Sequence, residues 1–210
     1  AAARDYEWSV HGDGWSWQMA DFSLPSLQRP AMAGPFQLQN AAGVLATLAV
    51  AGFEDLLQAN RVDAALAGVA LPGRAQLVDD RFILDVAHNP AAAVALANAM
   101  SATGSGRAGA TIIGMLNDKD IAGVVEVLNP LTDHWIAVTA DSPRAFAADE
   151  LARQVSNATD RPCWIADSMS AAIDRASEVG AARDVILITG SFYTVGAALV
   201  ILAAAGDKHG

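Results

Sequence analysis

The sequence has 210 residues, of which 53% are hydrophobic and 17% are charged, and its net charge is −10. Its length allows one large domain, or one domain and part of another, and its apolar content supports a substantial core and excludes intrinsic disorder. With only two lysines, Lys119 and Lys208, the chain has no basic cluster, so we expect neither nucleic-acid binding nor attachment to an anionic membrane.

The single cysteine, Cys163, excludes an internal disulfide framework and a multi-cysteine zinc site, and we interpret it as a core residue. No signal-peptide pattern begins the chain, so we expect a cytoplasmic protein. Residues 185–205 carry no charge. Because Gly190 and Ser191 interrupt this stretch after a β-branched run, it predicts a strand and then a buried helix, and not a membrane span.

The first third of the chain predicts strands, a loop and two helices. Residues 5–18 predict two short aromatic strands around a turn at 11–14, and the prolines of 22–36 predict mostly loop. An alanine-rich helix is expected over 39–51 and a second helix over 54–69.

A domain boundary is predicted at Leu71-Pro-Gly-Arg74, because Pro-Gly is a strong turn signal and predicted strands and helices alternate after it. Strands are expected at 75–79, 82–87, 110–116, 134–139 and 184–189, and helices at 90–102, 119–129, 147–155, 168–179 and 192–205. This alternation predicts an α/β fold of Rossmann-like type, with a mostly parallel sheet covered by helices on both faces.

In such a fold ligands bind beyond the carboxyl ends of the strands. Four segments follow predicted strands, and all four should open onto one edge of the sheet. They are residues 85–90 (DVAHNP), 114–120 (GMLNDKD), 141–144 (DSPR) and 190–192 (GSF).

Asp85 and His88 are the first candidates for catalysis. Asp85 is a carboxylate inside a strand that should be buried, so it needs a partner or a ligand. His88 ends that strand, with Asn89 as an expected N-cap and Pro90 in the first helical turn. The alternative is that Asp85 and His88 bond only to each other or to the backbone.

Three further residues are substrate candidates. Lys119 lies on the predicted ligand edge, although its neighbours also fit a simple N-cap with solvated charges. Arg144 could clamp a carboxylate or pair with Asp141. Ser191, at a strand-to-helix turn, could help to hold an anion or only allow the last helix to pack. Arg74, at the boundary, is a possible anion contact.

Several catalytic motifs are absent from these 210 residues. No G-x-x-x-x-G-K-[ST] sequence occurs, so the chain carries no P-loop. There is also no G-x-S-x-G elbow and no grouping of ligands at metal spacing, so we assign no metal residues. The chain by itself lacks the parts that activate a nucleotide phosphate.

Five motifs in order nevertheless resemble a known family: residues 71–74, 84–90, 113–120, 143–144 and 189–192. Together they resemble the C-terminal half of the bacterial bifunctional dihydrofolate synthase/folylpolyglutamate synthases, in the Mur ligase superfamily. The resemblance extends over about residues 5–205. It implies an ATP-dependent amide ligase in which a folate or pteroate carboxylate is phosphorylated and then attacked by the amino group of L-glutamate.

The resemblance also implies domains and roles. Residues 1–71 would be the C-terminal portion of the ATPase domain, and residues 72–210 the Mur ligase C-terminal domain. Asn40, Arg74 and Asp85 would contact ATP, and His88 matches a histidine implicated in activity. The P-loop and the Mg²⁺ ligands are expected in an N-terminal region outside these residues. The resemblance implies a monomer whose partners are ATP, L-glutamate and dihydropteroate or folate.

Two alternatives remain open. A Mur-type peptidoglycan ligase shares the Ala-His-Asn-Pro motif at 87–90 but joins amino acids to a sugar nucleotide. The chain could also be a ligand-binding fragment that has no activity alone, as the missing P-loop suggests. The sequence does not decide which glutamate the parent enzyme adds, nor which residues form the glutamate pocket.

Overall fold

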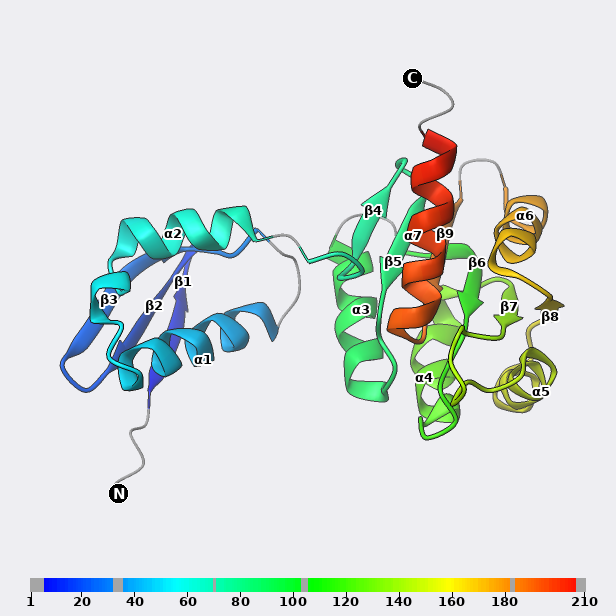
Figure 1. Cartoon of the computed structure of the whole chain (residues 1–210), viewed down its shortest axis with the longest axis horizontal. Helices are drawn as coiled ribbons and strands as arrows, with labels where there is room; N and C mark the ends of the chain where they lie inside the picture. The colour runs from blue at the N-terminus through cyan, green and yellow to red at the C-terminus, as the bar shows by residue number, and fades with distance from the viewer. Residues whose placement is uncertain (1–5, 32–35, 70, 103–105, 182–183, 207–210) are drawn as a thin grey trace. The chain divides into compact units, whose positions relative to one another are not determined.

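The computed structural model describes residues 6–31, 36–69, 71–102, 106–181 and 184–206. The chain divides into two compact units, Ala1–Leu71 and Pro72–Gly210 (Figure 1). The division falls at the Pro-Gly turn. Which domain each unit represents remains a prediction.

The first unit is a three-stranded antiparallel sheet with two α-helices. Strands β1 (Glu7–His11), β2 (Gly14–Met19) and β3 (Phe22–Gln28) pair in the order β1-β2-β3. Helix α1 (Phe36–Val50), the 3₁₀ helix η1 (Glu54–Leu56) and helix α2 (Ala59–Gly68) follow. Trp15, Trp17 and Leu27 of the sheet pack with Leu45 and Val62 of the helices in one core.

Two expectations for this unit are wrong. Residues 22–28 form β3, although their proline predicted loop; Pro25 is tolerated because β3 is an edge strand, and Leu24 and Leu27 point into the core. The second helix is also not continuous. Leu57 is buried and Gln58 is extended, so the chain leaves η1 and restarts as α2.

The second unit is a six-stranded sheet in the order β4-β5-β9-β6-β7-β8. Only β4 is antiparallel to its neighbour. The strands are β4 (Gln76–Val78), β5 (Phe82–Asp85), β6 (Ala108–Ile113), β7 (Trp135–Val138), β8 (Cys163–Ala166) and β9 (Val185–Thr189). The helices are α3 (Pro90–Ala102), α4 (Ile121–Leu128), η2 (Asn129–Leu131), α5 (Ala148–Ala158), α6 (Met169–Val179) and α7 (Phe192–Gly206).

Helices cover both faces of this sheet, as predicted. Successive strand residues point to opposite faces, so Ile113 packs in a core with α3, α4 and α5, whereas Ile112 packs in a second core with α6 and α7. Residues 185–206 are indeed a strand followed by a helix. None of the helices in the described ranges is long and apolar enough to cross a membrane.

Strand β8 was not predicted. It is a four-residue edge strand whose Ile165 is exposed, so it lacks the continuous apolar run of a buried strand. Cys163, expected in the core, is only half-buried there, and burial still raises the pKa of its thiol to about 11.

Candidate functional site at the carboxyl edge of the sheet

Three parallel strands of the second unit end at the same level. Asp85 at the end of β5 is paired with Thr189 at the end of β9, and Thr189 is paired in turn with Ile113 at the end of β6. The segments that follow these strands therefore emerge at one edge of the sheet, where ligands bind in folds of this type.

A cavity of about 340 Å³ lies at this edge. It is lined by His88, Leu116, Lys119, Arg144, Gly190, Ser191, Phe192 and Tyr193. The structure thus brings together four residues that the sequence singled out: an imidazole, an ammonium group, a guanidinium group and a hydroxyl group. They come from loops after four different strands, β5, β6, β7 and β9.

The loop after β5 holds His88 in a defined orientation. Its Nδ1 lies 2.9 Å from the carbonyl oxygen of Val86, and because a carbonyl only accepts, Nδ1 donates this hydrogen bond. In the neutral ring, Nε2 is then the nitrogen with the free lone pair. Asn89 caps α3 as predicted, since its Oδ1 accepts from the N–H of Ala92 at 2.9 Å.

Asp85 is buried, with 8% of its surface exposed, and its partners are backbone amides. Its two carboxylate oxygens accept hydrogen bonds from the N–H groups of Ala75 and Ala87, both at 2.8 Å. Burial raises the pKa of Asp85, and these two hydrogen bonds and the charges of Arg74 and His88 oppose the rise. The carboxylate therefore ties the turn at 72–75 to the end of β5.

That turn presents Arg74 beside the cavity. Gly73 has φ of +72° and its carbonyl accepts from the N–H of Val86 at 2.9 Å, which fixes the turn on the strand. The exposed guanidinium of Arg74 lies over the ring of Phe192, with Cζ 5.8 Å from the ring centroid. Phe192 thus connects Arg74 to the cavity that it lines.

Lys119 and Arg144 are on neighbouring loops that are hydrogen-bonded to each other. The N–H of Asn117 donates to the carbonyl of Arg144 at 2.8 Å. Lys119 pairs with Asp118 at 3.0 Å, and this hydrogen bond lowers the pKa of Asp118. Among the described residues Arg144 forms no ion pair with Asp141 or with any other carboxylate. Its charge also lowers the pKa of Asp118, but only as a longer-range electrostatic effect.

Ser191 is buried, and its hydroxyl is occupied within α7. Oγ accepts from the N–H of Thr194 at 3.1 Å and lies 2.7 Å from Thr194 Oγ1. Thr194 Oγ1 donates its own hydrogen to the carbonyl of Gly114, so Ser191 donates to Thr194. At this point of the cavity the donors left for a ligand are therefore the backbone N–H groups of Phe192 and Tyr193, which precede the first hydrogen bond within the helix.

Asn40 is not part of this cavity. It lies on α1 in the first unit and lines a different cavity there. The two aromatic residues Phe192 and Tyr193 were not proposed as site residues from the sequence. Their position directly after the Gly190-Ser191 turn places them at the carboxyl edge. This position in the sequence could have identified them as site residues. Within the described ranges, no three His, Cys, Asp or Glu side chains cluster as a metal site would require.

Comparisons with known proteins identify relatives over nearly the whole chain. Residues 73–192 match the family described as Mur ligase, glutamate ligase domain. The dihydrofolate synthase/folylpolyglutamate synthase of Escherichia coli K12 is 35% identical over 205 residues, which cover 96% of this chain and 46% of that protein. The enzyme of the same name from Mycobacterium tuberculosis is 31% identical over 79% of this chain and 38% of its own length.

Solved structures are similar over the same span. The Escherichia coli FolC structure in complex with DHPP and ADP has a TM-score of 0.78 at 34% identity, and covers 96% of this chain. A bifunctional folylpolyglutamate synthase/dihydrofolate synthase with Mn, AMPPNP and L-glutamate bound has a TM-score of 0.73 at 32% identity. The chain covers 46% of each of these two proteins, so it spans about half the length of its relatives. With its family match over residues 73–192 and its parallel sheet carrying the loops of the cavity, the chain belongs to the Mur ligase, glutamate ligase domain family.

Proposed function

We propose that the chain is the C-terminal part of an ATP-dependent amide ligase that adds L-glutamate to dihydropteroate, to folylpolyglutamate, or to both. The observation that carries this proposal is the cavity at the carboxyl edge of the sheet, which brings together His88, Lys119 and Arg144. The chain's relatives are called dihydrofolate synthase/folylpolyglutamate synthase. The isolated chain has no P-loop, so we expect it to be inactive by itself.

The cavity has the charge that L-glutamate requires. Glutamate carries two carboxylates, and the cavity supplies Arg144 and Lys119, the latter shared with Asp118, together with the N-terminal end of α7. Arg144 has no ion-pair partner among the described residues and can bind a carboxylate in a bidentate manner. We therefore assign Arg144 and Lys119 to the two carboxylates, and the Nε2 of His88 to the amino group.

In the proposed reaction, the terminal phosphoryl group of ATP is transferred to the carboxylate of the folate substrate, which gives an acyl phosphate and ADP. The neutral amino group of glutamate then forms a bond to the acyl carbon, the bond from that carbon to the phosphate oxygen breaks, and the proton lost by the nitrogen leaves with the phosphate as hydrogen phosphate. His88 Nε2 is placed to accept a hydrogen bond from the amino group, which would orient its lone pair toward the acyl carbon.

The nucleotide contacts in this proposal are Asn40, Arg74 and Asp85. Arg74 is exposed and beside the cavity, so its charge is available to the phosphates, whereas Asp85 acts by holding the turn that carries Arg74. Residues 1–71 would be the last portion of the ATPase domain. Mg²⁺ would be held by residues outside this chain, because the described residues offer no cluster of metal ligands.

The proposal places the enzyme in the cytoplasm, where a reducing environment keeps the lone cysteine as a thiol. Its partners would be its small-molecule substrates and its own ATPase domain, in a monomer.

An assay of ATP-dependent phosphate release with dihydropteroate and L-glutamate tests the function. It compares this chain, the longest polypeptide that its gene encodes, and that polypeptide with His88→Ala. Turnover only in the longer polypeptide, strongly reduced by His88→Ala, is the expected result. Turnover by the 210-residue chain alone contradicts the assignment of ATP activation to residues outside this chain. If the longer polypeptide releases phosphate with a sugar-nucleotide substrate but not with L-glutamate and dihydropteroate, it is a Mur-type peptidoglycan ligase instead.

A further inference from the structure

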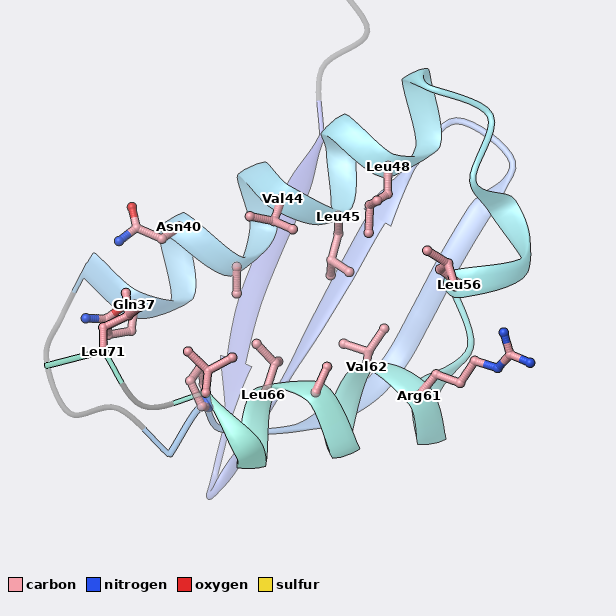
Figure 2. A pocket seen from close by; sticks show the side chains of 14 residues that line it. Gln37, Asn40, Val44, Leu45, Leu48, Leu56, Arg61, Val62, Leu66 and Leu71 are labelled. Carbon is pink, nitrogen blue, oxygen red and sulfur yellow. The ribbon is translucent and has the colours of Figure 1, made fainter.

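The two side chains proposed to reach the nucleotide from outside the sheet differ in how they are held. Asn40 is short and extends from helix α1, at one end of the cavity of the first unit (Figure 2). Arg74 lies in a turn, and its long side chain has several rotatable bonds, so fixing it in one orientation costs more conformational entropy. A neighbour that already holds the guanidinium therefore strengthens nucleotide binding.

The backbone of the turn that carries Arg74 is fixed from two sides. On one side, Asp85 and the N–H of Val86 hydrogen-bond the turn to the end of β5. On the other side the turn packs closely against α7, because a Cβ at Gly73 would lie 2.7 Å from Cγ1 of Val195. These contacts fix the backbone, but they do not hold the guanidinium.

Phe192 is the side chain that contacts the guanidinium. The Cζ of Arg74 lies 5.8 Å from the centroid of its ring. Phe192 precedes Val195 by three residues, so the two side chains lie on the same side of α7, where the turn packs. Among the residues that the structure describes, no carboxylate forms an ion pair with Arg74, and Asp85 interacts with it only through its charge.

The ring of Phe192 has no role in the core of the second unit. It is 62% exposed, although phenylalanine is usually buried, and it belongs to neither of the two core clusters there. The same ring lines the cavity to which we assign L-glutamate. One side chain thus adjoins both the proposed nucleotide contact and the proposed glutamate pocket.

We propose that Phe192 is a positioning residue, whose ring holds the guanidinium of Arg74 in the orientation that binds the phosphates of the nucleotide. The inference rests on the proposed function, in which Arg74 contacts ATP. The attraction is between a cation and the negative face of an aromatic ring. Position 192 therefore requires an aromatic residue, and an apolar residue of similar size does not replace it.

The test is a double-mutant cycle between positions 74 and 192, in the longest polypeptide that the gene encodes. Calorimetry measures the dissociation constant of AMPPNP with Mg²⁺ for the unmodified protein, Phe192→Leu, Arg74→Gln and the double variant. Phe192→Trp and Phe192→Tyr test rescue, because both keep an aromatic face. Val200→Ala is the control: Val200 lies about two turns further along α7, is 72% exposed and is not among the residues that line the two cavities.

Phe192→Leu should weaken AMPPNP binding about 2–10-fold, the effect of having to order one long side chain on binding. The tryptophan and tyrosine variants should bind AMPPNP as the unmodified protein does, and Val200→Ala should have no effect. In the Arg74→Gln background, Phe192→Leu should cause no further loss, because the group that it positions is gone. Since Phe192 is exposed, these variants should keep the melting temperature of the unmodified protein.

Three results overturn the proposal. Equal weakening by Phe192→Leu in both backgrounds shows that the ring contacts the nucleotide itself. Equal loss of affinity in the leucine, tryptophan and tyrosine variants shows that the shape of the side chain matters and not its aromatic face. An increase in the KM for L-glutamate with unchanged AMPPNP binding shows that the ring is only a wall of the glutamate pocket.

The binding measurements need no turnover, so they separate this inference from the proposed function. A polypeptide that shows the coupled loss of AMPPNP affinity yet adds no glutamate refutes the ligase function alone. One that adds glutamate to dihydropteroate, yet binds AMPPNP equally well with and without the ring of Phe192, refutes the positioning role alone.

Discussion

The carboxylate of Asp85 accepts a hydrogen bond at 2.8 Å from the backbone N–H of Ala75, ten residues earlier in the chain. Ala75 has φ of +45°, a conformation that residues with a side chain seldom adopt, so the turn at 72–75 needs an external tether. Asp85 supplies that tether from the end of β5. The side chain of Arg74, one residue before Ala75, is thereby directed to the edge of the sheet where the cavity lies.

We expect Asp85→Ala to lower the free energy of unfolding by about 1–3 kcal/mol at neutral pH, since it leaves the N–H groups of Ala75 and Ala87 without an acceptor. Urea denaturation of the 210-residue chain measures this change. Asp174→Ala is the control, because Asp174 is an exposed residue within α6, and it should change stability by less than about 0.5 kcal/mol. Equal effects of the two substitutions would contradict the tether.

The stability contributed by Asp85 should depend on pH. Burial raises its pKa above the ordinary value of 3.8, so the folded chain holds this proton at pH values at which the unfolded chain has released it. The proton-linked part of this contribution is therefore fully present below pH 3.8 and is lost as the pH rises through the raised pKa, whereas the part that the two backbone hydrogen bonds supply remains at neutral pH. The difference in unfolding free energy between the unmodified chain and Asp85→Ala should fall from acid toward neutral pH. A difference that grows with pH would show that the pKa is lowered in the folded state.

Gly190 should not tolerate a side chain. Its φ is +110°, and a Cβ there would lie 2.6 Å from the carbonyl oxygen of Gly114. We expect Gly190→Ala to cost about 1–3 kcal/mol. Gly196→Ala is the matched control within α7, where a Cβ meets nothing within 4 Å, and it should stabilise by about 0.5–1 kcal/mol. Thermal melts of the two variants should therefore shift in opposite directions, and a shift in the same direction would refute the close approach of Gly190 to Gly114.

The sheet of the second unit was predictable because its inner strands are continuous apolar runs and the ligand edge follows from topology. Both faces of β6 and β7 are buried, so their sequences carry a clear signal. The edge strands β3 and β8 carry a weaker one: Pro25 suggested loop in β3, and exposed Ile165 interrupts the apolar run of β8.

At the site, the sequence located the residues but not their partners. His88, Lys119, Arg144 and Ser191 were placed at one edge by their positions after strands, and all four line the cavity. Hydrogen bonds to the backbone were not predictable. The N–H of Ala75 that binds Asp85 and the carbonyl of Gly114 that accepts from Thr194 belong to separate loops, and how those loops meet is not encoded in the pattern of apolar and polar residues.

Arg144 provides the sharpest test of the glutamate pocket. In the longest polypeptide that the gene encodes, we expect Arg144→Gln to raise the KM for L-glutamate roughly 10–100-fold, because a charge-assisted hydrogen bond to a carboxylate contributes about 1.5–3 kcal/mol. The KM for ATP should change little, since the proposed nucleotide contacts are Asn40, Arg74 and Asp85. Steady-state kinetics with each substrate varied in turn separate these effects. Arg175→Gln is the control: Arg175 lies on α6, away from the residues that line the cavity, and pairs with Glu178 at 3.2 Å, so both KM values should stay unchanged. If Arg144→Gln raised both KM values equally, the arginine would position the loop and not bind glutamate.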